Sequence, residues 1–412
     1  MTKSSETAYD LVVFGATSFV GQILTRYLLE TYGVGQSVKW AIAGRSESKL
    51  NTLKGELGSK AKGLPVILAD ASNEAALKAM CEQTRVIIST VGPYALYGEP
   101  LVQACVRSGT DYCDLTGEVQ WIRKMVERYE EEAKSSGARI VHCCGFDSIP
   151  SDMGVYFLQQ QAQARFNAPA STVRMRVKVA KGGVSGGTVA SMMNIAEEAG
   201  KDPALRKKLA NPYLLCPPDH GFKSRQTSIG LASYDNDFNA WVGPFVMDAI
   251  NSRVVHRSNA LTGQAYTDHF TYNEAMLTGN GMGGRMKALG IGAGTGLFFA
   301  AAAIKPTRWA LNKFVVPQHG EGPSPEAQKA GFYDIRFVGH TDNKETLKVK
   351  VTGDADPGYG STAKLLGQAA ACLAQDVVED APGGFWTTAS LLGEPLLKRL
   401  QENAGMTFTV ID

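Results

Sequence analysis

The sequence predicts an α/β protein with a doubly wound parallel sheet, followed by an α+β domain with a mainly antiparallel sheet. In the first 150 residues, short apolar runs alternate with stretches of helical periodicity, as in βαβ units. From Val173 the period changes to two, and apolar residues alternate with Arg174, Arg176 and Lys178. This pattern predicts a strand with one buried face and one solvated, cationic face. The length of 412 residues is sufficient for two domains.

The first third contains five apolar runs that we expect to form strands, at residues 11–13, 38–43, 65–69, 85–89 and 138–142. Amphipathic stretches separate them, including one over 118–136 that carries charges on one side. Ligands bind at the carboxyl edge of doubly wound parallel sheets, so we expect the site residues directly after each apolar run.

FGATSFVG, residues 14–21, joins the first apolar run to a stretch of helical spacing. Gly15 suits the tight turn and Gly21 suits close packing of helix on strand, while the first free helical amides can bind a phosphate. Ser18 stands where a dinucleotide-binding turn ordinarily has glycine, so a plain βα corner stays open. The candidate cofactor contacts of this Rossmann-type turn are Gly15, Thr17, Ser18, Phe19, Val20 and Gly21.

The end of the second run predicts which nicotinamide cofactor binds. An NAD site usually has an acidic residue here for the ribose hydroxyls, whereas this chain has Arg45 followed by Ser46. A guanidinium suits a 2′-phosphate, so we expect NADP(H); an ordinary solvated arginine is the alternative. Asp70, after the third run, is the expected adenine contact.

Catalytic candidates follow the fourth and fifth runs, where the nicotinamide should lie. Gly92, Pro93 and Tyr94 would shape the loop at the ring. Hydride transfer requires a proton donor, for which we favour Tyr97 and Asp147, although either residue could instead be structural. No metal is expected because the six histidines are dispersed.

Several segments together resemble a known family. They are GATSFVG, AGRS, STVGPYALYGEPLVQAC, GTDYCDLTGE, CCGFDSIPSD, DPGYGSTAKLLGQAA and GFWTTASLLGEPLLKRLQENAGMTFTV. In this order they resemble the saccharopine dehydrogenase-like oxidoreductases, including the trans-acting enoyl reductase branch. That resemblance implies lipid or glycolipid assembly, hence reduction of a C=C or C=O bond in a hydrophobic substrate.

Two other functions stay open. An amino-acid imine dehydrogenase would need arginines that converge on a dicarboxylate, for which Arg174 and Arg176 could serve. The second open function is that of a non-catalytic scaffold that binds NADPH or lipid. It stays open because Ser18 departs from the usual dinucleotide-binding turn and the sequence identifies no proton donor with certainty.

We expect a dinucleotide-binding domain at 1–150, a substrate domain at 151–357, and a helical segment at 358–412 that packs back on the first domain. Residues 288–304 form an apolar run between Lys287 and Lys305, close to Trp309. This run predicts a buried helix or hairpin, or alternatively a peripheral membrane contact or an acyl-chain tunnel.

Composition limits the partners and the compartment. The net charge of +2 and the scattered basic residues argue against nucleic acid. Seven cysteines without CxxC spacing and an N-terminus without an apolar core predict a cytoplasmic protein with reduced thiols. Peripheral attachment at the inner face of the plasma membrane, and a homodimer, are further expectations that the sequence leaves open.

Overall fold

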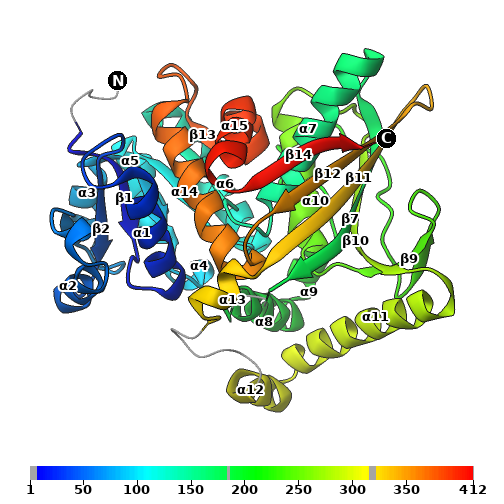
Figure 1. Ribbon diagram of the computed structural model, residues 1–412, viewed down its shortest axis with the longest axis horizontal. Coiled ribbons are helices and arrows are strands. Elements are labelled where there is room, and N and C mark those ends of the chain that lie inside the picture. Colours follow the sequence, from blue (N-terminus) through cyan, green and yellow to red (C-terminus); the bar gives the residue numbers. More distant parts are fainter. Residues whose placement is uncertain (1–6, 183–185, 315–321, 412) are drawn as a thin grey trace. The chain divides into compact units, whose positions relative to one another are not determined.

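The computed structural model describes residues 7–182, 186–314 and 322–411 (Figure 1). These residues divide into two compact units. The first unit contains the chain up to Phe146, together with Gly322 and the segment Tyr359–Ala404. The second contains Asp147 to Gly358 apart from Gly322, and the chain from Gly405 onward.

The first unit is built on a seven-stranded sheet in the order β13-β6-β5-β4-β1-β2-β3. Every neighbouring pair of these strands is parallel. The predicted doubly wound parallel sheet is therefore confirmed. Its strands are β1 (Tyr9–Phe14), β2 (Trp40–Gly44), β3 (Val66–Leu68), β4 (Thr84–Ser89), β5 (Asp111–Asp114), β6 (Arg139–Val141) and β13 (Gly384–Trp386).

Helices pack on this parallel sheet, as buried parallel strands require. They are α1 (Phe19–Tyr32), α2 (Glu47–Glu56), η1 (Ser59–Ala61), α3 (Glu74–Cys81), α4 (Tyr94–Tyr97), α5 (Glu99–Ser108), α6 (Val119–Ser136), α14 (Thr362–Gln375), η3 (Thr388–Leu392) and α15 (Gly393–Asn403). Helix α14 packs beside α1 over β1, β4 and β5, while α5 packs with α3 and α6. The buried length of α14, from Thr362 to Ala374, consists mainly of small and aliphatic residues.

The second unit is built on a mixed seven-stranded sheet in the order β14-β12-β11-β7-β10-β9-β8. Only β7 and β10 pair in parallel, and the other neighbours are antiparallel. The prediction of a mainly antiparallel second sheet is therefore confirmed. The strands are β7 (Ala170–Lys181), β8 (Ser233–Asp235), β9 (Ala240–Pro244), β10 (Thr271–Gly279), β11 (Phe332–Thr341), β12 (Thr346–Gly353) and β14 (Met406–Ile411).

Helix α7 covers β7, β11, β12 and β14 on one face of this sheet. Gly154 makes the close packing possible, because a Cβ there would lie 2.3 Å from the Phe337 ring. The helices of the second unit are α7 (Ile149–Phe166), α8 (Gly186–Lys201), α9 (Pro203–Leu209), α10 (Asp248–Leu261), α11 (Gly281–Ala303), α12 (Lys305–Phe314) and α13 (Pro325–Lys329), and the π-turn η2 (Pro357–Ser361) joins the two units.

Two expectations need correction. Arg176 was expected on a solvated face, yet it is 2% exposed because β8, its loop and Asn273 supply polar partners that enclose it. The segment 358–412 was expected to be helical, yet it also contributes β13 to the first sheet and β14 to the second. Short strands near a chain end carry too little periodicity to be recognised from sequence.

Candidate functional site

The turn between β1 and α1 has the geometry of a phosphate-binding loop. Gly15 adopts φ +88°, which favours glycine, and a Cβ there would lie 2.7 Å from Val91. A Cβ on Gly21 would lie 2.2 Å from the Gly15 carbonyl oxygen. The first turn of α1 can therefore lie against the loop only with glycine at position 21, and its amides open onto the carboxyl edge of the sheet.

Ser18 is the N-cap of α1 and does not simply replace a glycine. Its Oγ accepts a hydrogen bond from the Gly21 amide at 3.0 Å and lies 3.0 Å from Thr90 Oγ1. Thr90 in turn donates to the Gly15 carbonyl at 2.9 Å. The hydroxyl thus ties the turn to the end of β4, and backbone amides such as those of Phe19 and Val20 are left to bind an anion.

The other turn residues take structural positions around these amides. The Thr17 carbonyl accepts from the Gln22 side chain at 3.1 Å. The Phe19 ring packs edge-on against Tyr359, with 4.8 Å between centroids. The Phe19 ring is therefore engaged within the protein, which leaves the Phe19 backbone amide as its candidate cofactor contact.

Arg45 is exposed directly after β2, where an adenosine ribose binds in this type of fold. Ser46 caps α2 by accepting from the Lys49 amide at 3.4 Å, so a second helix N-terminus opens beside the guanidinium. Asp70 accepts from the Ser72 amide at 2.9 Å and from its hydroxyl at 2.7 Å. These bonds, with a smaller contribution from Arg45, lower the pKa of Asp70.

The loop after β4 is held by a buried carboxylate that the sequence analysis did not single out. Glu118 accepts from the amides of Tyr94 at 2.8 Å and Ala95 at 3.0 Å. The Tyr94 hydroxyl donates to the Ser89 carbonyl at 2.9 Å, and burial raises its pKa well above the usual value. Tyr94 thus supports the loop, while the cis peptide Gly92–Pro93 precedes it.

Tyr97 has a different environment from Tyr94. Its side chain is 51% exposed at the end of the short helix α4, near the carboxyl edge of β4. Within the part of the chain that the structure describes, its hydroxyl has no hydrogen-bond partner. Tyr97 is therefore free to approach a ligand.

A buried polar group at the ends of β5 and β6 was not predicted as a unit. Asp114 accepts from Tyr112 at 3.0 Å and lies 2.7 Å from His142 Nδ1, and it also accepts from the Cys143 amide at 3.2 Å. Cys143 adopts φ +63°. Asp114 thereby fixes the turn that leads out of β6, and the burial of both thiols of Cys143 and Cys144 agrees with packing roles.

Comparisons with known proteins identify this arrangement. Residues 11–141 match the family described as saccharopine dehydrogenase NADP binding domain. A protein of Mycobacterium tuberculosis, provisionally named a trans-acting enoyl reductase, is 38% identical over 379 residues, which cover 89% of each chain. The trans-acting enoyl reductase of Mycobacterium bovis is 36% identical over 385 residues, or 90% of each chain.

The chain belongs to the saccharopine dehydrogenase-like oxidoreductase family. The fold agrees, because a saccharopine dehydrogenase of Saccharomyces cerevisiae superposes with a TM-score of 0.55 at 10% identity, covering 98% of this chain and 100% of that one. This family member is an NADP(H)-binding oxidoreductase, as the sequence predicted. The glycine cradle at Gly15 and Gly21 and the exposed Arg45 fit that cofactor.

Asp147, the other predicted catalytic residue, is the first residue of the second unit of this oxidoreductase. Thr188 donates to its carboxylate at 3.3 Å. Burial raises the pKa of Asp147 to about 6, and the bond from Thr188 opposes that shift. A carboxyl that titrates near neutral pH is suited to proton transfer.

A buried acidic cluster lies on α7, α10 and β10 of the same unit. Glu274 accepts from Tyr272 at 2.7 Å and from Asn251 at 2.9 Å, and its amide donates to Asp248. Burial and the neighbouring Asp248 raise the pKa of Glu274 to about 8. The raised pKa favours the neutral form of Glu274, which avoids two like charges side by side. Asn251 also accepts from Ser148, which follows Asp147 in the chain.

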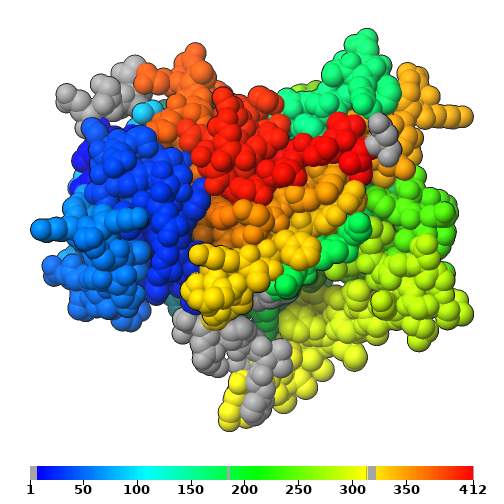
Figure 2. All heavy atoms as spheres, in the orientation of Figure 1, coloured from blue at the N-terminus to red at the C-terminus, as the bar shows by residue number. Residues whose placement is uncertain are grey.

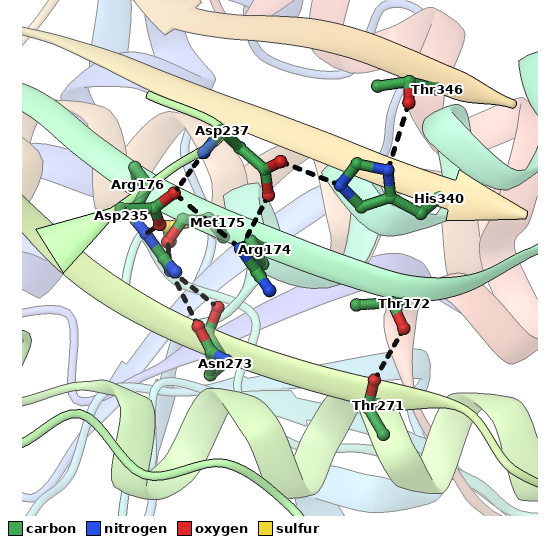
Figure 3. A network of polar contacts seen from close by, with 10 residues as sticks. All are labelled: Thr172, Arg174, Met175, Arg176, Asp235, Asp237, Thr271, Asn273, His340 and Thr346. Atoms are coloured by element: carbon green, nitrogen blue, oxygen red, sulfur yellow. Dashed lines mark hydrogen bonds and ion pairs between the residues drawn. The ribbon is translucent and has the colours of Figure 1, made fainter. Parts of the chain in front are cut away.

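Figure 3 shows a charged network on the second sheet, built around Arg174 and Arg176 of β7. Arg176 donates to Asp235 at 2.6 Å and to the Asn273 side chain at 2.8 Å. Arg174 donates to Asp237 at 2.8 Å, and Asp237 also lies 3.0 Å from His340. Both arginines are thus neutralised by carboxylates of this chain, which disfavours their use for a dicarboxylate substrate.

Metal ligation has no support from the described part of the chain. No group of three or more His, Cys, Asp or Glu side chains there could hold an ion.

Proposed function

We propose that this chain is an NADPH-dependent reductase of a C=C bond conjugated to a carbonyl, in a hydrophobic acyl or glycolipid-precursor substrate. Similarity along about nine-tenths of the chain to trans-acting enoyl reductases carries the proposal. A C=O bond in the same class of substrate is the nearest variant. Arg174 and Arg176 are already paired with carboxylates of this chain, which disfavours the imine dehydrogenase alternative.

We assign cofactor binding and proton donation to different residues. The amides after Gly15 bind the pyrophosphate and Arg45 binds the 2′-phosphate, so the cofactor is held for the hydride transfer that NADPH supplies when bound. The reduced carbon chain then needs a proton on the carbon next to the carbonyl. Asp147 and Tyr97 are our candidates for its source, the first for its raised pKa and the second for its exposed hydroxyl.

Cofactor choice gives the first test. In Arg45→Ala we expect NADPH affinity to fall about 10- to 100-fold, because a charge-assisted hydrogen bond contributes ~1.5–3 kcal/mol. NADH affinity should change little. Fluorescence titration of both cofactors measures the difference, with Arg26→Ala as a matched control because Arg26 is exposed on α1 of the same unit. Equal losses for NADPH and NADH would refute the role of Arg45. No binding of either cofactor would favour a scaffold that binds lipid.

Turnover gives the second test, in which NADPH oxidation is followed with a long-chain 2-enoyl thioester. If Asp147 donates the proton, kcat/KM should fall about tenfold per pH unit above pH 6, because the acid form is lost there. Asp147→Asn should lower kcat by ~10²–10⁴ and remove that pH dependence.

Tyr97→Phe is the matched comparison for the turnover test. If Tyr97→Phe loses activity while the decrease of kcat/KM above pH 6 is retained, the role of proton donor passes to Tyr97. Activity on imines of amino acids, with none on enoyl or keto substrates, would overturn the proposed reaction.

A further inference from the structure

Helix α11 packs on the second sheet through its small residues. Gly284, Ala288 and Gly292, spaced four apart along one side of the helix, are buried. A Cβ on Gly292 would lie 2.6 Å from the Leu231 carbonyl oxygen, and one on Gly243 of β9 would lie 3.2 Å from the Ala288 carbonyl. Through this stripe the helix backbone lies close to β9 and to the chain at Leu231, and Arg285 adds a cation–π contact with Trp241 of β9 at 5.3 Å.

The large apolar residues of α11 lie on its other sides, and α12 continues this surface. Leu297 is 71% exposed, Met282 69% and Met286 59%, and beyond the end of the helix Ile304 is 57% and Trp309 61% exposed. Figure 2 shows the atoms of α11 and α12, in yellow-green and yellow, at the surface along the lower part of this view. We call the exposed side chains of residues 281–311, together with Lys313, the α11–α12 surface. Several exposed large apolar side chains on one segment are typical of an interaction site.

The charges on the α11–α12 surface all have one sign. Residues 281–314 contain no Asp or Glu and five cations: Arg285, Lys287, Lys305, Arg308 and Lys313. Arg308 is paired with Glu197 at 3.1 Å, and Lys313 lies over the Trp309 ring at 5.0 Å. Lys287 and Lys305 flank the apolar run on either side. Cations that border apolar residues, together with a tryptophan, complement an anionic lipid surface.

We propose that the α11–α12 surface docks on the surface of an anionic lipid bilayer, which goes beyond the proposed reaction. Helix α11 is long and apolar enough to cross a membrane by length and composition, with 17% of its most apolar window buried. Two observations favour a helix α11 that lies on the membrane surface over one that crosses the membrane. The 17 residues between Lys287 and Lys305 span about 26 Å, less than the ~30 Å hydrocarbon core. A crossing would also separate Gly292 from Leu231 and so uncover β9.

Vesicle flotation of the full chain tests this docking. We expect binding to phosphatidylcholine vesicles that contain phosphatidylglycerol, weaker binding at high salt, and little to pure phosphatidylcholine. Leu297→Asp should reduce binding more than tenfold. The double variant Lys287→Gln/Lys305→Gln should reduce it about 25-fold, since each lysine near an anionic surface contributes a factor of about five. A blue shift of tryptophan emission on binding should be lost in Trp309→Phe.

Matched controls come from the first unit. Val378→Asp changes a side chain that is 65% exposed there, and Lys60→Gln/Lys62→Gln removes two exposed charges. Both should bind vesicles like the native chain, and every variant should keep its melting temperature and NADPH affinity. That last readout separates failure of the docking from failure of the proposed reaction.

Three results would overturn the docking. One is equal binding of the α11–α12 variants and the controls. Another is a native dimer, measured by light scattering, that Leu297→Asp converts to a monomer without any effect on vesicle binding. The third is resistance of vesicle-bound protein to an alkaline carbonate wash, which would indicate a crossing helix.

Discussion

Arg176→Ala should lower the free energy of unfolding by ~3–5 kcal/mol, because the buried carboxylate of Asp235 loses the guanidinium that donates to it at 2.6 Å and keeps only the more distant Arg174, at 3.9 Å. Both side chains of this pair are 2% exposed, so water cannot replace the guanidinium. Asn273 would lose its hydrogen bond as well. Urea unfolding, followed by circular dichroism, measures the change.

Arg174→Ala is the matched control for this prediction. Arg174 lies two residues away on the same strand and is paired with Asp237, but its side chain is 36% exposed. Its removal should cost no more than ~1 kcal/mol. The double variant Arg176→Met/Asp235→Leu should recover most of the loss, since an apolar pair needs no compensation. Equal costs for Arg174→Ala and Arg176→Ala would show that burial of the pair has no energetic consequence.

Gly21→Ala should abolish tight NADPH binding, with an expected loss of at least about 10- to 100-fold in affinity. The added Cβ would stand 2.2 Å from the Gly15 carbonyl oxygen and 2.9 Å from the Ala16 backbone, so α1 must move away from the turn. That movement withdraws the amides that bind the pyrophosphate, each worth ~1.5–3 kcal/mol when it bonds to a charged group. Overpacking should also cost ~1–3 kcal/mol of stability.

Gly55→Ala provides the control, because Gly55 is also helical and a Cβ there meets nothing within 4 Å. This change should leave NADPH affinity unaltered and raise stability by ~1 kcal/mol, the helix propensity difference. Titration with NADPH and thermal unfolding of both variants give the comparison. Native affinity in Gly21→Ala would mean that the β1–α1 turn does not hold the cofactor.

The parallel sheet could be predicted because its signals are local. Five of its seven strands are short apolar runs, while β5 (Asp111–Asp114, DYCD) and β13 carry no such run and were not predicted. Gly15 and Gly21 are required by the geometry of a single turn. The role of Ser18 was harder to predict. Its spacing from Gly21 is that of an N-cap, but the bond to Thr90 crosses 72 residues of sequence and depends on β1 lying beside β4.

The second unit departed from prediction where distant segments supply the environment. Alternation along β7 correctly identified a strand, but period two only separates its faces and does not say what covers each one. Asp235 lies 59 residues beyond Arg176, so the burial of that arginine is decided by the pairing of β8 with β9 and of β9 with β10. The raised pKa values of Asp147 and Glu274 likewise depend on burial by helices that no local pattern places.

The sequence by itself determined the fold class and the NADP(H) cofactor, and it predicted the turn that would bind the phosphates, because each depends on residues that are neighbours in the chain. It also identified 288–304 as unusually apolar, but a helix that is apolar on all sides gives no indication of which side faces the protein. Only the tertiary structure decided that. The buried glycines and alanine of α11 fit closely against β9 and the backbone at Leu231, so the side chains of Met282, Met286 and Leu297 are left exposed.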